Sequence, residues 1–177
     1  MGKKDRISHC FMNRIYVILV IVLMLHLPLA AQERLPAVTL KAIDGEEIRL
    51  SDFIALNKVL VISLWATYCP PCIDEFSKVT GLYDSWKKEI DFEFIAISID
   101  DQRSSGRIKS LVEVRKWPFI FLIDEMKETK AALGYSDIPF YYIVDRNGKI
   151  VFSHEGYSPG DESIMLSELK KAGRNSK

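Results

Sequence analysis

The chain has 177 residues, enough for one domain with an ordinary hydrophobic core and a terminal extension. Its 24 basic and 24 acidic residues cancel, so composition gives no electrostatic reason to expect a nucleic-acid partner. No internal repeat or low-complexity tract is visible, which excludes solenoid, propeller and other repeat architectures.

The N-terminal segment has the order of a secretory signal: four basic residues, an apolar run at 15–31, and then a polar stretch. The alternative is an uncleaved anchor helix with its basic end inside. The apolar run is shorter than the roughly 20 residues of a spanning helix, and His26 and Pro28 interrupt it. We therefore expect residues 1–31 to be a signal peptide or membrane anchor, and residues 32–177 to form a domain outside the cytoplasm.

The first half of this domain contains a hairpin pattern, a buried strand and a helix. Residues 36–53 predict two short strands around a turn at Asp44-Gly45. Residues 58–65 are almost continuously apolar, as expected for a parallel strand covered on both faces. The motif WATYCPPC follows at 65–72, and apolar residues then recur at helical spacing from Cys72 to Trp86.

The second half alternates strand and helix patterns. In chain order we expect a strand at 91–100, a helix in the second half of 101–117, a buried strand at 118–124, a short helix at 125–134, a hairpin of 140–144 with 149–153, and an amphipathic helix at 160–172. This order predicts a mixed α/β sheet flanked by helices. The CPPC segment then lies where a buried strand meets a helix, the edge at which open α/β sheets usually carry their chemistry.

Several kinds of site can use a Cys-Pro-Pro-Cys pair. Structural zinc takes four ligands, and His154 is the only histidine beyond residue 31. Covalent haem attachment needs a histidine after the second cysteine, where Ile73 stands. A disulfide across two residues restrains the unfolded chain little, so it is a poor structural staple. A two-thiolate Cu(I) site stays open as an alternative to redox chemistry.

The redox interpretation supplies a mechanism from position alone. Cys69 would lie at a helix N-terminus, with Pro70 and Pro71 in the first turn, where their missing N–H groups cost little. Unpaired N–H groups and the helix dipole stabilise a thiolate there. Cys72, one turn further, would be more shielded. Cys69 is thus expected to attack a substrate disulfide, and Cys72 to release the product from the mixed disulfide.

This ordered set of motifs resembles the thioredoxin fold. WATYCPPC follows an apolar strand, Ile138-Pro139 precedes another, and DRNGKIV follows that one. Within the fold, residues 35–172 are similar to the exported TlpA/ResA/DsbE-like thiol–disulfide oxidoreductases. The resemblance implies a central mixed β-sheet flanked by helices, with an N-terminal β-hairpin and an inserted helix between 91–100 and 118–124.

The resemblance also implies residue roles. Cys69 matches the family's attacking cysteine and Cys72 its resolving partner. Pro139 matches a cis-proline that lies against the disulfide and, with Ile138, helps to bind the substrate backbone. Trp65 matches the strand-end tryptophan. The remaining positions expected to border the substrate groove are Tyr68, Pro70 and Pro71.

Glu75 matches an acidic residue near the active site of ResA-like members. Many thioredoxins instead bury an aspartate at the position of Ser63, so Glu75 is the candidate to assist proton transfer to Cys72. The alternative is a solvated acid that interacts only with the helix dipole. His154 is expected on the surface, and the aromatic run at 140–142 within the sheet packing.

Taken together, these features predict an enzyme that reduces disulfides of exported proteins, with apocytochrome c as a narrower option. It would need no cofactor, but it would need a membrane thiol electron donor, and residues 15–31 could tether it to the membrane. Tyr68 and Phe140 depart from the residues usual in relatives, so the sequence does not identify the client protein. The alternatives are a disulfide oxidase or isomerase, and a Cu(I)-handling module; a peroxidase is disfavoured because the chain around Cys69 lacks the spaced proline and threonine that would cradle a peroxide.

Overall fold

The computed structural model describes residues 34–175, so the expected signal peptide or anchor at 1–31 lies outside the described residues. Within that range no helix combines the length and apolar character needed to cross a membrane. The strands are β1 (Thr39–Ala42), β2 (Glu47–Arg49), β3 (Val59–Trp65), β4 (Phe92–Ser98), β5 (Ile120–Ile123), β6 (Phe140–Val144) and β7 (Ile150–Glu155). The helices are α2 (Pro70–Glu89), α3 (Ser105–Arg115), α4 (Glu128–Leu133) and α5 (Asp161–Asn175), with two 3-10 helices, η1 (Leu50–Leu56) and η2 (Gln102–Ser104).

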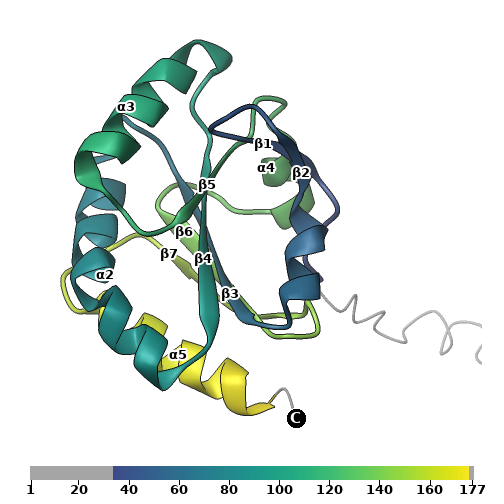
Figure 1. Ribbon diagram of the computed structural model, residues 1–177. Coiled ribbons are helices and arrows are strands. Elements are labelled where there is room, and N and C mark those ends of the chain that lie inside the picture. Colours follow the sequence, from purple (N-terminus) through teal and green to yellow (C-terminus); the bar gives the residue numbers. More distant parts are fainter. Residues whose placement is uncertain (1–33, 176–177) are drawn as a thin grey trace, which may run out of the picture. The chain divides into compact units, whose positions relative to one another are not determined.

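The strands form one mixed sheet in the order β2-β1-β5-β4-β3-β6-β7 (Figure 1). β3 runs parallel to β4, and β4 parallel to β5, whereas β6 pairs antiparallel with β3 and with β7. Every residue of β3 is buried, as its continuous apolar run predicts. The N-terminal hairpin extends the sheet because β1 pairs antiparallel with β5.

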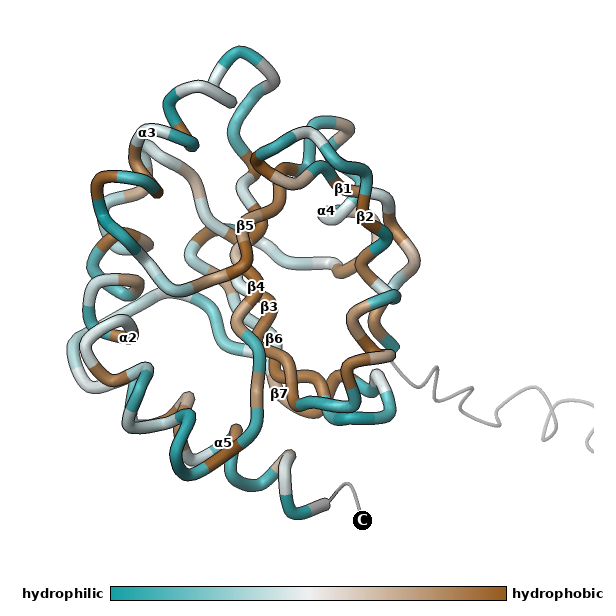
Figure 2. The backbone as a smooth tube through the Cα atoms, in the orientation of Figure 1, coloured by the Kyte–Doolittle hydropathy of each residue, from teal (hydrophilic) through white to brown (hydrophobic). Residues whose placement is uncertain are grey.

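Helices cover both faces of the sheet. α2, α3 and α5 lie on one face, and η1 and α4 on the other (Figure 1). Each face has its own hydrophobic cluster, and Figure 2 shows the hydrophobic colouring concentrated along the central strands between the two layers. The cluster beneath α2 is aromatic: the ring centroid of Phe76 lies 5.3 Å from Trp65 and 5.2 Å from Trp117. These tilted and edge-on contacts hold α2, and with it the CPPC segment, against the sheet.

The predicted elements are found, with one difference in the N-terminal hairpin. Residues 50–53, expected to continue the second strand, instead begin the 3-10 helix η1. Leu50 is fully buried and Phe53 and Ile54 pack on the same cluster, a spacing that a single helical turn provides. Asn57, in the left-handed conformation, ends the helix. The inserted helix is α3, between β4 and β5.

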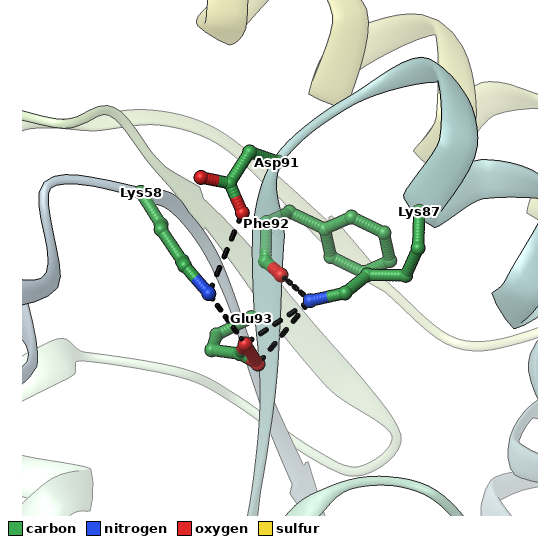
Figure 3. A network of polar contacts seen from close by, with 5 residues as sticks. All are labelled: Lys58, Lys87, Asp91, Phe92 and Glu93. Atoms are coloured by element: carbon green, nitrogen blue, oxygen red, sulfur yellow. Dashed lines mark hydrogen bonds and ion pairs between the residues drawn. The ribbon is translucent and has the colours of Figure 1, made fainter.

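An ion-pair network joins α2 to the amino ends of β3 and β4, at the opposite end of these strands from the CPPC segment (Figure 3). Glu93 Oε1 lies 3.0 Å from Nζ of both Lys58 and Lys87, and Lys58 Nζ also lies 3.4 Å from Asp91 Oδ1. Lys87 in addition donates to the carbonyl oxygen of Phe92. Glu93 is thus the shared acceptor that binds the end of α2 to the sheet.

Glu93→Gln is expected to lower the free energy of unfolding by about 1 kcal/mol, because two partly exposed lysines lose their common partner. Urea unfolding measures this loss, which should shrink in high salt as the charges are screened. Glu113→Gln, at an exposed position of α3, is the control and is expected to change little. Equal losses in both variants would contradict a specific role for the network.

Candidate active site at the start of helix α2

The CPPC segment turns the chain from β3 into α2. Trp65 ends β3, and the amide of Cys69 donates to the carbonyl oxygen of Ala66 at 3.1 Å. Cys69 is the N-cap of α2, with Pro70 and Pro71 as the first two helical residues. Prolines fit there because the first amides of a helix have no intrahelical partner.

The two cysteines form a disulfide, with a Cα–Cα distance of 5.4 Å. Cys72 is fully buried, whereas Cys69 retains 6% of its surface. The amide of Cys72 donates to Cys69 Sγ at 3.3 Å. After reduction, the same amide and the helix dipole would stabilise a thiolate on Cys69 and not on Cys72. The pair is therefore asymmetric: Cys69 is slightly exposed and its Sγ accepts a hydrogen bond, whereas Cys72 is fully buried.

The Ile138–Pro139 peptide bond is cis, as the resemblance implies. Pro139 directly precedes β6, and Phe140 pairs with Leu64 near the end of β3. This register brings the proline to the sheet edge from which the CPPC segment begins. Pro139 is buried, while Ile138 and Phe140 are half-buried.

Glu75 lies in the second turn of α2 on its buried face, with 1% of its surface exposed. The alternative of a solvated, dipole-compensating acid is therefore wrong. Neither carboxylate oxygen has a hydrogen-bond partner among residues 34–175. Burial, with a smaller contribution from the charge of Asp161, raises the pKa of Glu75 from 4.5 to about 8. A carboxyl group three residues after Cys72 thus exchanges its proton near neutral pH.

Tyr141, whose pKa is affected by the charge of Glu75, was not identified from the sequence as part of the site. It is the register partner of Ser63 on β3, and in the described part of the chain the buried hydroxyl groups of both residues lack a partner. Burial raises the pKa of Tyr141, and the charge of Glu75 adds to the effect. An inward-facing tyrosine at 141 follows from strand alternation, but its proximity to an acid on α2 requires the tertiary structure.

The predicted groove residues occupy different depths. Tyr68 is 65% exposed beside Cys69, and Pro70 and Pro71 are exposed on the first turn of α2. Trp65, in contrast, is fully buried, so it supports the motif from beneath and presents no surface to a substrate. Pro70 and Pro71 border an open groove whose other residues are Asp74, Ser77, Lys78, Tyr157 and Pro159.

Two further expectations concern side chains near the site. His154 is partly buried on β7, with Nε2 3.2 Å from Oδ2 of Asp161, so it is not a free surface histidine. Tyr141 and Tyr142 are buried in the sheet packing, as expected. In the part of the chain that the structure describes, no three His, Cys, Asp or Glu side chains are arranged to hold a metal ion.

Comparisons with known proteins agree with this geometry. The family model described as Redoxin matches residues 30–171. The thiol-disulfide oxidoreductase ResA of Geobacillus thermodenitrificans is 26% identical over 115 residues, which cover 65% of this chain and 63% of that protein. ResA of Bacillus anthracis is 27% identical over 109 residues, or 62% of this chain and 60% of that protein. The chain thus matches less than two thirds of the length of these curated relatives.

Solved structures confirm the thioredoxin fold. A thioredoxin-like protein from Porphyromonas gingivalis superposes with a TM-score of 0.72 and 34% identity, covering 81% of this chain and 94% of that chain. A putative thiol:disulfide interchange protein DsbE from Chlorobium tepidum gives a TM-score of 0.70 at 23% identity, over 80% and 96% of the two chains. At the latter identity the likeness concerns the fold alone.

Proposed function

Because the chain belongs to the Redoxin family, we propose that it is a thiol–disulfide oxidoreductase whose Cys69–Cys72 pair alternates between a disulfide and a dithiol. The observation that carries the proposal is the asymmetry of the pair at the helix N-terminus. Cys69 is the more exposed residue and its Sγ accepts a hydrogen bond from the Cys72 amide, while Cys72 is fully buried. Such an arrangement activates one sulfur for attack and reserves the other for resolution.

In the reductive direction, the Cys69 thiolate attacks one sulfur of a client disulfide. A mixed disulfide forms, and the second client sulfur leaves as a thiolate. Cys72 then loses its proton and attacks Cys69 Sγ, which restores the Cys69–Cys72 disulfide and releases the client as a dithiol. Two electrons pass from the protein to the client, and a donor must return them before the next cycle.

We assign to Glu75 the transfer of the proton to and from Cys72. The carboxyl is buried on the same face of α2 as Cys72, with a pKa near 8. A base or acid works best when its pKa lies near the working pH and near that of its partner, and a thiol has an ordinary pKa of about 8.5. In its ionised form Glu75 therefore accepts the proton when Cys72 attacks, and it returns the proton when the disulfide is reduced.

We propose that the client protein binds at the surface beside Cys69. This proposal is supported by the exposed ring of Tyr68, next to Cys69 in the chain, and by the position of Ile138 and Pro139 directly before β6, whose first residue pairs with Leu64 near the end of β3. The signal-like N-terminal pattern supports clients that are exported proteins, and a reductant outside the cytoplasm would need a membrane thiol donor. The curated relatives named thiol-disulfide oxidoreductase ResA support the exchange reaction itself. Within this class, apocytochrome c thiols before haem attachment are the narrower candidate.

The reduction potential of the purified protein, equilibrated in defined thiol buffers, tests the proposal. A value near or below about −270 mV is expected for a reductant that needs a dedicated donor. A value between about −120 and −180 mV would instead identify an oxidase or isomerase. A protein without a reversible couple would overturn the proposal and direct attention to Cu(I) binding.

A further inference from the structure

Asp100 is a buried carboxylate beside the CPPC segment that the proposed mechanism does not use. It is 1% exposed and follows the end of β4. Its oxygens accept from the Thr67 amide at 2.8 Å, the Thr67 hydroxyl at 2.6 Å and the Ser98 hydroxyl at 2.7 Å. These hydrogen bonds to a charged acceptor are short, and such bonds are among the stronger ones in proteins.

The parallel pairing of β3 and β4 explains why Asp100 meets Thr67. Beyond the last register pair, Trp65 with Ser98, the amide of Ile99 still donates to the carbonyl oxygen of Trp65 at 2.9 Å. The two chain segments then leave the sheet side by side. Asp100 thus reaches the first turn of the loop that carries Cys69.

Thr67 stands two residues before Cys69, so its anchorage affects where the attacking sulfur lies. Asp100 fixes both the backbone and the side chain of Thr67. On the other side of the loop, the Cys69 carbonyl oxygen accepts from the Ile73 amide at 3.2 Å, within α2. Cys72 belongs to this helix, so Cys69 is held between the helix and the anchored Thr67.

We propose that Asp100 is a positioning residue of the redox pair, which anchors Thr67 and thereby keeps Cys69 within bonding distance of Cys72. The inference rests on the proposed exchange reaction at these cysteines. A residue that stabilises the oxidised and reduced forms equally leaves the reduction potential unchanged, however much stability it contributes. Asp100 is inferred to favour the disulfide form, because a loosened loop lowers the effective concentration of one sulfur at the other.

Asp124 provides a matched control at the end of the neighbouring strand β5. It too is 1% exposed, and it accepts from the amides of Glu128 and Thr129, both at 3.0 Å, and from the Thr129 hydroxyl. These groups belong to α4, on the other face of the sheet from α2 (Figure 1). None of the three hydrogen bonds that the Asp124 carboxylate accepts comes from the Cys69 loop. The Asp124 segment is linked to Asp100 through backbone carbonyl oxygens: the Asp124 amide donates to Ser98, and Lys127, the N-cap of α4, donates to Ile99 and Asp100. Asp124→Ala removes none of these backbone acceptors.

The experiment measures the equilibrium constant of the Cys69–Cys72 couple with glutathione, in full-length proteins that carry Cys10→Ser so that no third thiol exchanges. Asp100→Ala is expected to make the disulfide about tenfold easier to reduce, which corresponds to a rise of ~30 mV in the reduction potential. Asp124→Ala is expected to change the constant by less than about twofold, although both variants lose stability. Equal shifts in the two variants would assign Asp100 a structural role only and overturn the inference.

Two milder variants decide the question if Asp100→Ala does not fold. Thr67→Val keeps the shape of the side chain but removes one of the three donors, and should shift the constant about threefold in the same direction. Asp100→Asn keeps an acceptor for the Thr67 amide, so its equilibrium constant with glutathione should stay close to that of the wild type. An unchanged constant in Thr67→Val would overturn the inference. A wild-type protein without a reversible couple would instead overturn the proposed function.

Discussion

Cys72→Ser is expected to accumulate mixed disulfides with client proteins through Cys69, whereas Cys69→Ser should accumulate few or none. The first variant can still attack a client, but no second sulfur displaces the product. The second variant retains only the fully buried sulfur, which lies away from the N-cap position that favours a thiolate. Client turnover should fall about 10³-fold or more in both variants, because the two cysteines act as one unit.

Intact-mass analysis after incubation with a disulfide-bearing protein, without reducing agent, distinguishes the variants. The adduct should carry the mass of one client and disappear on addition of a thiol reductant. All proteins carry Cys10→Ser, because Cys10 is a third thiol that could form an adduct of its own. In this background Cys69→Ser/Cys72→Ser is the control for non-covalent association and should form no adduct. Equal trapping by the two single variants would show that the roles of the cysteines are wrongly assigned.

The strands and the redox pair could be predicted from the sequence because their signals are local. β3 is a continuous apolar run, and all seven of its residues are buried. Two consecutive prolines after Cys69 are compatible with the first turn of a helix but not with its interior, so they place the N-cap at Cys69. The cis bond before Pro139 follows only from the family resemblance, since few bonds before proline are cis.

The remaining features of the site depend on contacts between segments distant in sequence. Helical spacing places Glu75 on the same face of α2 as Cys72 and Phe76, yet a charged residue in that position also fits a solvated helix edge. Asp100 contacts Thr67 only because β3 and β4 pair in parallel with a particular register. The η1 helix likewise forms where Leu50 finds a buried position on the sheet.

The burial of Glu75 lowers the stability of the folded protein but favours its proposed role in proton transfer. A buried carboxyl without a hydrogen-bond partner is costly to ionise, and its cost falls on the folded state alone. Such a group is a poor choice for stability but a good proton donor and acceptor near neutral pH. Its replacement by a neutral residue of similar shape should therefore improve the fold and impair the reaction, a combination that a purely structural residue does not produce.

Glu75→Gln is expected to remove a pH dependence from the stability of the oxidised protein. The pKa of Glu75 is raised from 4.5 to about 8 in the folded state, so the folded protein keeps a proton that the unfolded chain releases. The stability linked to this group is complete below about pH 4.5 and declines as the pH rises to about 8, by up to roughly 4 kcal/mol. Glutamine does not titrate, so the variant should be the more stable protein at pH 8.

Urea unfolding of the wild type and the variant at pH 5, 7 and 8 measures the slope. Asp84→Asn, at an exposed position of the same helix, is the matched control and should leave the wild-type slope in place. The same Glu75→Gln protein should resolve a mixed disulfide about 10²-fold more slowly at pH 8, where a large share of the wild-type Glu75 is ionised and can accept the proton of Cys72. A wild-type stability that does not change between pH 5 and 8 would show that Glu75 is ionised in the folded protein. If the variant has the expected stability but resolves mixed disulfides at the wild-type rate, Glu75 is not the proton acceptor. Another group, such as solvent water, then takes the proton of Cys72.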